Sequence, residues 1–112
     1  MYLIEVENVK EGFSERELIP FYHDFLDNAI TEAKRLKKVC PRNNYRVFST
    51  LKELVYSSIE FERSLIDSLL ESNKLWSVFL DKNDCSPELI EKIKNVINVN
   101  NNIIDGYKMS DF

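Results

Sequence analysis

Residues 46–80 read RVFSTLKELVYSSIEFERSLIDSLLESNKLWSVFL and contain neither glycine nor proline, the two residues that most readily end a helix. Apolar residues recur at helical spacing along the whole stretch, and at about 100° per residue they fall in one broad stripe. The length of the run and the absence of period-two alternation argue against a strand. The pattern predicts one long helix, which Ser72 and Asn73 could break because both residue types favour caps.

One charged residue, Glu62, falls near the centre of this apolar stripe, between Ile59 and Ile66. Two interpretations are open. In the first, helix packing changes partner at this point and leaves Glu62 in a gap at the surface. In the second, the carboxylate is buried or half-buried and is paired with Lys, Arg or Tyr, because a buried charge is costly unless it is paired. The second interpretation would mark a buried polar site.

A helix is also predicted before this stretch, from Ser14 to Cys40. Ser14 and Glu17 have the spacing of a capping box, and Pro20 predicts a kink or a restart inside the helix. Acids crowd its start and bases its end, which suits the helix dipole. The residues expected on its buried stripe are Leu18, Tyr22, Phe25, Leu26, Ala29, Ala33, Leu36 and Cys40.

The last helix is predicted to open at Ser86, as the cap, with Pro87 at the first helical position. Residues 2–10 suit either a short strand or a turn or two of helix. An extended arm or a short helix packed on the bundle is favoured, because a lone strand needs a partner. Together these elements predict an all-α fold, a small bundle of three main helices plus one or two short ones, in a single domain of residues 1–112.

The composition, with 44% apolar and 30% charged residues, is that of an ordinary soluble globular protein. The sequence predicts no transmembrane helix and no signal peptide, so the expected location is the cytoplasm. Cys40 and Cys85 have no second cysteine nearby, which excludes a disulfide scaffold and a Cys-rich zinc site. Two glycines are too few for a glycine-rich phosphate loop. The chain is therefore not expected to be an enzyme or to hold a cofactor or a metal.

The net charge of −4 is unevenly distributed along the chain. Residues 1–33 carry eight acids and two bases, residues 34–52 carry seven bases and no acid, and residues 53–112 carry eleven acids and six bases. Nucleic-acid binding is not expected of an acidic chain with one basic band, because phosphate neutralisation needs a wide positive face. A basic protein partner, or self-pairing of the unlike patches, fits this distribution better.

Arg16 and His23 are separated by six residues. This spacing resembles the Arg-x4–6-His signature of the HEPN ribonucleases, small helical bundles whose arginine and histidine act on RNA in a dimer cleft. The resemblance covers two residues, Pro20 interrupts it, and it makes an RNase the least favoured function. Residues 21–30 look like the first helix of the flagellin export chaperones, which are helical bundles that wrap a secreted protein.

Elimination leaves a protein-interaction module with polarised charge. The leading hypothesis is an immunity protein of bacterial or phage origin, an antitoxin-like inhibitor that occludes the active site of a basic toxin such as a nuclease. An acidic face would imitate the phosphates of the substrate, and the residues assigned to it are Glu5, Glu7, Glu11, Glu15, Asp24 and Asp27. The alternatives are a helical export or assembly chaperone, which would bind an amphipathic segment in a groove, and a phage-encoded inhibitor of a host enzyme.

A second interface candidate lies where the first predicted helix connects to the long one. Arginine and aromatic side chains together are typical of binding hot spots, and this corner supplies both in Arg42, Tyr45, Arg46 and Phe48. The basic band around it could bind phosphate or an acidic partner. It could equally be a helix end covered with solvated cations.

Overall fold

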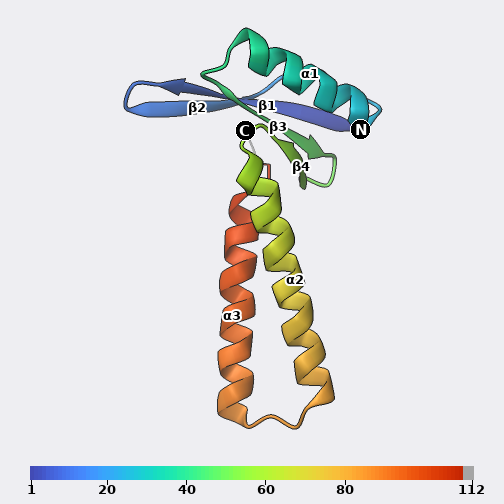
Figure 1. Cartoon of the computed structure of the whole chain (residues 1–112), viewed down its shortest axis with the longest axis vertical. Helices are drawn as coiled ribbons and strands as arrows, with labels where there is room; N and C mark the ends of the chain where they lie inside the picture. Colours follow the sequence, from blue (N-terminus) through green and yellow to red (C-terminus); the bar gives the residue numbers. More distant parts are fainter. Residues whose placement is uncertain (110–112) are drawn as a thin grey trace. The chain divides into compact units, whose positions relative to one another are not determined.

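The computed structural model describes residues 1–109, and these combine an antiparallel sheet with three helices (Figure 1). The prediction of an all-α helical bundle is therefore wrong, and the fold is a mixed α/β one. The chain divides into two compact units: Met1–Arg63 with the chain from Lys108 form the sheet unit, and Ser64–Tyr107 form the hairpin unit. The elements in chain order are β1 (Tyr2–Lys10), β2 (Phe13–Leu18), α1 (Leu26–Val39), β3 (Asn44–Ser49), β4 (Leu54–Ser57), α2 (Glu60–Lys82) and α3 (Pro87–Gly106).

The strands form one sheet in the order β2–β1–β3–β4, and every neighbouring pair is antiparallel. β1 is a central strand, which pairs with β2 over Glu5–Lys10 and with β3 over Tyr2–Glu7. Residues 2–10, for which strand and helix were both open, therefore form a strand. The two neighbours supply the partners that a lone strand would lack.

The helix predicted from Ser14 is wrong over its first half, because residues 13–18 form β2. Gly12, in the turn before β2, has a φ of +84°, a left-handed conformation that glycine adopts without steric cost. The Ser14 hydroxyl donates a hydrogen bond to Glu7 across the strand pair (3.0 Å) instead of capping a helix. Pairing with β1 thus outweighs the local capping signal, and α1 begins only at Leu26.

The long helix is wrong over residues 46–59, which form most of β3, the β3–β4 turn and β4. Val47 and Phe48 match a helical stripe in the sequence, but as neighbours in a strand they are buried on opposite faces of the sheet. The chain reverses direction at Lys52, which has a φ of +64°. From Glu60 the prediction of a helix is confirmed, and α2 runs without a break to Lys82.

One face of the sheet is covered by α1 (Figure 1). Two fully buried alanines allow the helix to approach the sheet closely, and they pack against large residues of the two central strands. This core consists of Ile4, Ala29, Ala33, Tyr45 and Val47. Alternation along the strands sends the intervening residues, including Glu5 and Arg46, to the other face. The polar groups described below therefore lie on the side of the sheet away from α1.

The hairpin unit consists of most of α2 and all of α3, which lie side by side and antiparallel (Figure 1). The predicted start of α3 is confirmed, because the Ser86 hydroxyl accepts a hydrogen bond from the Leu89 N–H (3.3 Å). After α3, the Met109 N–H donates a hydrogen bond to the carbonyl of Lys52 in the β3–β4 turn (3.0 Å). Within residues 1–109, none of the helices has the length and apolar character needed to cross a bilayer.

Candidate functional site

The six acids assigned to a partner-binding face lie in three places: Glu5 and Glu7 in β1, Glu11 and Glu15 in the β1–β2 hairpin, and Asp24 and Asp27 beside the start of α1. Glu5 is 0% exposed. The start of α1 lies by the beginning of β1, because His23 pairs with Tyr2, whereas Glu11 follows the end of β1. These two ends are about 25 Å apart by strand length. The structure thus does not bring the six carboxylates together.

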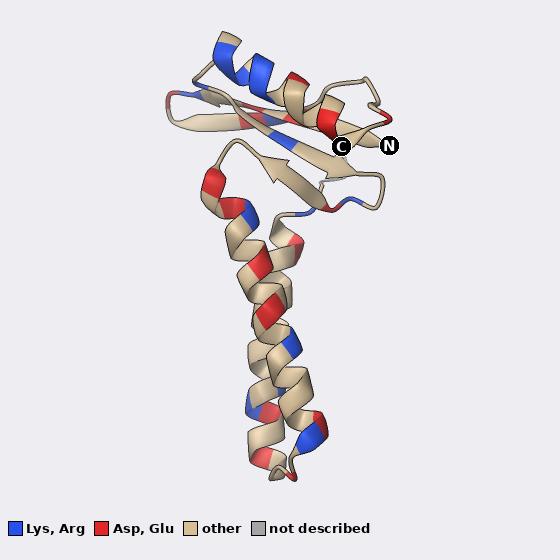
Figure 2. Ribbon diagram, turned by 45° about the vertical axis from the view of Figure 1, so that its right-hand side comes forward, with Lys and Arg blue, Asp and Glu red and all other residues tan. Residues whose placement is uncertain are grey.

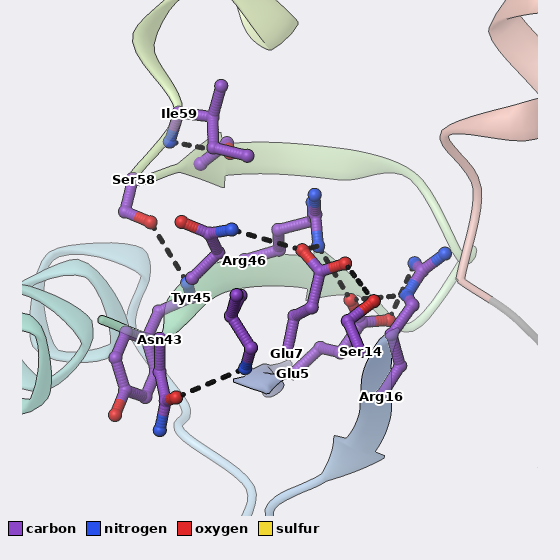
Figure 3. Close-up of polar contacts among 12 residues, drawn as sticks. Glu5, Glu7, Ser14, Arg16, Asn43, Tyr45, Arg46, Ser58 and Ile59 are labelled. Atoms are coloured by element: carbon purple, nitrogen blue, oxygen red, sulfur yellow. Dashed lines mark hydrogen bonds and ion pairs between the residues drawn. The ribbon is translucent and has the colours of Figure 1, made fainter. Parts of the chain in front are cut away.

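An ionic cluster lies on the face of the sheet away from α1 (Figure 3). We call it the Arg46 cluster; Glu5, Arg46 and Glu62 are buried in it, and Glu7 and Arg16 are half-buried at its edge. Arg46 donates from Nε and Nη2 to the two carboxylate oxygens of Glu62, at 2.8 and 3.0 Å. Its Nη1 donates to Glu5 and to Glu7, at 3.2 Å each. Arg16 donates from Nε and Nη2 to the two oxygens of Glu5, at 2.8 Å each.

The strand register explains why these residues meet. Glu5 and Glu7 are two residues apart in β1 and therefore share a face of the sheet. Arg46 of β3 is directly opposite Glu5, and Arg16 of β2 is directly opposite Glu7. Ser57 of β4 is opposite Arg46, and its hydroxyl donates a hydrogen bond to the Glu62 carboxylate. Opposite charges on neighbouring strands stabilise a sheet, so the cluster holds all four strands in one alignment.

Two members of the cluster, Arg46 and Glu7, have pKa values shifted in favour of their charged forms. Burial alone would lower the pKa of Arg46, but hydrogen bonds and charge from Glu62, with the charges of Glu7 and Glu5, raise that pKa well above its ordinary value. Burial raises the pKa of Glu7, whereas hydrogen bonds from Asn44 and other neighbours and the charge of Arg46 together lower it below its ordinary value. Neither shift moves a group toward neutral pH, so the cluster is suited to fixing the strands rather than to proton transfer.

Of the two interpretations of Glu62, the structure has the buried carboxylate paired with an arginine. The same pairing bears on the second interface candidate, because Arg46 belongs to both. Tyr45, Arg46 and Phe48 are all buried in β3, and Arg42, in the connection before it, is exposed. Three of the four residues are thus buried in a central strand and the fourth is exposed outside it, so the structure does not place them together on a surface.

The two residues that resemble a ribonuclease motif lie in different settings. Arg16 is in β2, and its guanidinium is bound to Glu5. His23 lies in the loop before α1, where its backbone exchanges two hydrogen bonds with Tyr2 (2.8 and 2.9 Å). Its ring meets that of Phe21 edge to face, with the centroids 4.9 Å apart. The RNase hypothesis stays a prediction, and this geometry adds nothing in its favour.

The segment of residues 19–25, which we call the aromatic loop, carries a surface that the sequence interpretation missed. Phe21, Tyr22 and Phe25 are 61%, 57% and 67% exposed. The sequence pattern places Tyr22 and Phe25 on the buried stripe of a helix, but the helix begins only at Leu26. The signal that could have revealed them is Pro20 followed by three aromatic residues within five positions, which suits a loop better than a helix.

Backbone hydrogen bonds hold the aromatic loop against β1. The Ile19 N–H donates to the carbonyl of Ile4 (2.8 Å), and Tyr2 and His23 exchange their two bonds further along. A tight turn closes between them, where the Phe21 N–H donates to the carbonyl of Ile19 (2.7 Å). The loop is therefore fixed by its main chain, and its exposed aromatic side chains project from an ordered support.

Charge changes sign along α1 (Figure 2). Asp24 and Asp27 are exposed beside the aromatic loop at the start of the helix. Lys34, Lys38 and Arg42 are exposed toward its end and just beyond it. The distribution suits the helix dipole, and it places the acidic groups, rather than the basic ones, next to the exposed aromatic residues.

Within residues 1–109, no three His, Cys, Asp or Glu side chains are placed to hold a metal ion together. Cys40 is exposed and Cys85 is half-buried, and both are free thiols. Comparisons of the chain with protein-family models, with curated proteins and with solved structures find no match. The function therefore has to be argued from the surfaces of the molecule.

Proposed function

We propose that this chain is a non-catalytic protein-interaction module that binds a basic protein partner through the aromatic loop and the adjoining start of α1. The observation that carries the proposal is the exposure of Phe21, Tyr22 and Phe25. Aromatic residues are enriched at the centres of protein interfaces, where they fill pockets and dominate the binding energy. With most of its surface free, each of these rings has about 100 Å² left to bury against a partner.

The support of the loop favours this use. Its main chain is bonded to β1 at Ile4 and at Tyr2, so the rings are presented by backbone that is already ordered. Binding costs less conformational entropy when the contact residues do not have to be ordered first. A fixed loop that carries three exposed rings thus has the properties of a preorganised contact surface.

The two carboxylates beside the rings give the surface its charge preference. Asp24 and Asp27 would attract a basic partner, raise the association rate and make binding sensitive to salt. Glu5 and Glu7 take no part in this contact, because their carboxylates are bound within the Arg46 cluster. The proposal therefore uses two of the six acids that the sequence assigns to the partner.

Within this class of proteins, the specific function that we propose is that of an immunity protein, acting in the cytoplasm, that occludes a basic toxin such as a nuclease. The aromatic rings would enter an apolar recess of the toxin, and the carboxylates would pair with its cationic substrate-binding groups. A phage-encoded inhibitor of a host enzyme would use the same contact and would differ only in its partner.

The test is affinity capture from the lysate of the native host at low and high salt, with identification by mass spectrometry and then titration of the purified partner. The variant Asp24→Asn/Phe25→Ala is expected to weaken binding about 100-fold, because it removes an anchor and its neighbouring charge. The matched control, Glu11→Gln/Phe13→Ala, changes the same kinds of side chain at the other end of β1 and should leave the affinity within about threefold. Equal affinities of the two variants would contradict the proposal.

The second candidate, a helical export or assembly chaperone, is favoured by one observation. The hairpin unit exposes large apolar side chains, among them Leu75, Trp76 and Phe79. A chaperone would bind an amphipathic segment there, so capture would survive high salt and would not respond to Asp24→Asn/Phe25→Ala. Loss of the partner at high salt would exclude this candidate.

A further inference from the structure

The hairpin unit is built on a seven-residue repeat. The residues that line the contact between its two helices recur at alternating spacings of three and four, which is the spacing of a coiled coil. We call this contact the seam, and it consists of Ile66, Leu69, Asn73, Trp76 and Leu80 of α2 and Ile90, Ile93, Ile97, Asn100 and Ile104 of α3.

A polar layer in the middle of the seam fixes the alignment of the two helices. The buried Asn100 donates from Nδ2 to Oδ1 of Asn73 (2.9 Å) and to Oγ of Ser72 (3.5 Å). Asn73 in turn donates from Nδ2 to Oδ1 of Asn101 (2.9 Å). A polar seam residue that finds its partner in only one alignment specifies that alignment. Because the helices are antiparallel, heights along the hairpin can be counted from this layer. A residue a given number of positions before Asn73 on α2 lies level with the residue the same number of positions after Asn100 on α3.

A second apolar stripe lies one position before the seam on each helix. An antiparallel pair of helices is related by an approximate two-fold axis perpendicular to the plane of the pair. Residues one position before a seam residue, whether on α2 or on α3, therefore lie on the same side of the hairpin. We call the resulting surface the hairpin face; its apolar members, all 38–61% exposed, are Leu75, Phe79, Leu89, Val96, Val99 and Ile103.

The hairpin face is large for a chain that contacts only water. Together the six side chains expose about 500 Å² of apolar surface if each fully exposed side chain has about 150–200 Å². That area is near the upper end for the largest apolar patch of a monomer, about 300–600 Å². Two such faces packed together bury about 1,000 Å², which is the lower limit of about 1,000 Å² expected of a biological interface. One seam residue, Trp76, is also incompletely buried, at 37% exposed.

The shape of the hairpin face indicates what covers it. An open groove runs along α2 and is lined by Asp67, Ser68, Glu71, Ser72, Leu75, Trp76 and Phe79. At one end of the groove the residues of the stripe are small, Ser68 and Ser72. Counted from the polar layer, Ile103 of α3 lies at the height of the space between these two serines. The hairpin face therefore carries a large side chain on α3, Ile103, and at the same height on α2 a space that could receive one.

We infer that the chain forms a homodimer in which two α2–α3 hairpins pack face to face as a four-helix bundle, with α2 of each copy against α3 of the other. A two-fold axis parallel to the helices produces this arrangement, and every neighbouring pair of helices is then antiparallel. The Ile103 side chain of one copy then enters the space between Ser68 and Ser72 of the other. Small residues then face large ones, as a packed core requires.

One charged residue, Lys92, also lies one position before the seam and therefore belongs to the hairpin face. Counted from the polar layer, Lys92 lies at nearly the height of Lys82 of α2, so charge pairing adds nothing to the dimer and the apolar contacts carry it. The inference goes beyond the proposed partner binding, which uses the sheet unit, and each dimer carries two aromatic loops.

The test is analytical ultracentrifugation of the full chain between about 1 and 100 μM, with helix content followed by circular dichroism. The chain is expected to dimerise with a Kd at or below about 10 μM. Leu75→Glu, on the hairpin face, should raise the Kd more than about 30-fold. The matched control is Leu70→Glu, which introduces the same charge at another exposed leucine on the opposite side of the seam. It should leave the Kd within about threefold.

A second experiment tests which helices meet. In the proposed dimer Leu75 of one copy lies beside Val99 of the other, so Leu75→Glu and Val99→Lys should each be monomeric alone and should associate when mixed, through one Glu–Lys contact and one native contact. A monomeric wild-type chain at about 100 μM, equal effects of Leu70→Glu and Leu75→Glu, or no association on mixing would each overturn the inference. A monomer that binds an amphipathic helix on this face would also overturn it, in favour of the chaperone. The partner-binding proposal is tested on other residues, so the two failures are distinguishable.

Discussion

The sheet unit buries charge, whereas the hairpin unit exposes apolar surface. In the sheet unit Arg46 and Glu5 are buried, and every hydrogen-bonding atom of a buried side chain in the described residues has a partner. In the hairpin unit Leu75 and Val99 are more than half exposed, although they lie beside the seam. A buried charge that is fully paired is explained within the chain, while an apolar face left open points outside it.

The difference predicts two kinds of stability. The sheet unit should depend on Arg46 above all, because removing it takes the counter-charge from the buried Glu62. The hairpin unit should depend on protein concentration, because a second copy adds apolar contacts only to the folded state. The predictions below separate these two behaviours, in order of decreasing effect.

Arg46→Met should destabilise the protein by about 3–5 kcal/mol, since it leaves the buried Glu62 without a counter-charge and Glu5 with Arg16 alone. The measurement is urea unfolding followed by far-UV circular dichroism at fixed protein concentration. The matched control is Arg35→Met, which removes an exposed arginine paired with Glu32 on α1 and should cost at most about 0.5 kcal/mol. A loss of stability below about 1 kcal/mol for Arg46→Met is the size expected of an exposed ion pair, and it would mean that the cluster is solvated.

Asn73→Leu/Asn100→Leu should stabilise the hairpin unit by about 1–2 kcal/mol and remove the preference for one alignment of its helices. Chemical unfolding measures the first effect. Broadened or duplicated amide NMR signals from residues 64–107 report the second. The control, Asn98→Leu, changes an exposed asparagine of α3 away from the seam and should leave one set of signals. A single sharp set from the double variant would show that apolar packing alone fixes the alignment.

Acid should weaken the sheet unit through Glu7. Its pKa is lowered in the folded protein relative to the usual value of 4.5, so its contribution is complete above the pKa of the unfolded chain. The contribution is lost as pH falls through the folded pKa, and stability should therefore decline below about pH 4.5. Glu7→Gln should reduce this decline by less than about 1 kcal/mol, and Glu17→Gln, an exposed change, should leave it intact. Identical pH profiles of the Glu7→Gln variant and the wild type would contradict the assignment.

Local signals predicted most of the helical residues and failed for the strands. The apolar stripe of α2 and the Ser86–Pro87 start of α3 are determined by residues a few positions apart, and both helices are present. β3 is buried on both faces, so its run of apolar residues lacks the alternation that would have identified a strand and also fits a helical stripe. The capping box at Ser14 is a second local signal, which pairing between β1 and β2 overrides.

The candidate site could be predicted only in part for the same reason. Local charge assigns Asp24 to the partner surface, and Asp24 is exposed. The same reasoning assigns Glu5, but Glu5 is buried against Arg16 and Arg46, which are 11 and 41 residues away in the sequence. Only strand register reveals that contact. The aromatic loop was missed because its exposure depends on where α1 begins.

The hydrogen bond from Met109 to Lys52 has a consequence for the length of the hairpin. The chain leaves the sheet unit after Arg63 and rejoins it at Lys108, so the residues between form a closed loop of the polymer. The entropic cost of closing a loop rises only with the logarithm of the loop length, by about 0.6 kcal/mol for each doubling. One heptad added to each helix costs a fraction of that and extends the seam by a full repeat. The reach of the hairpin can thus change while the sheet unit and its pairing stay as they are.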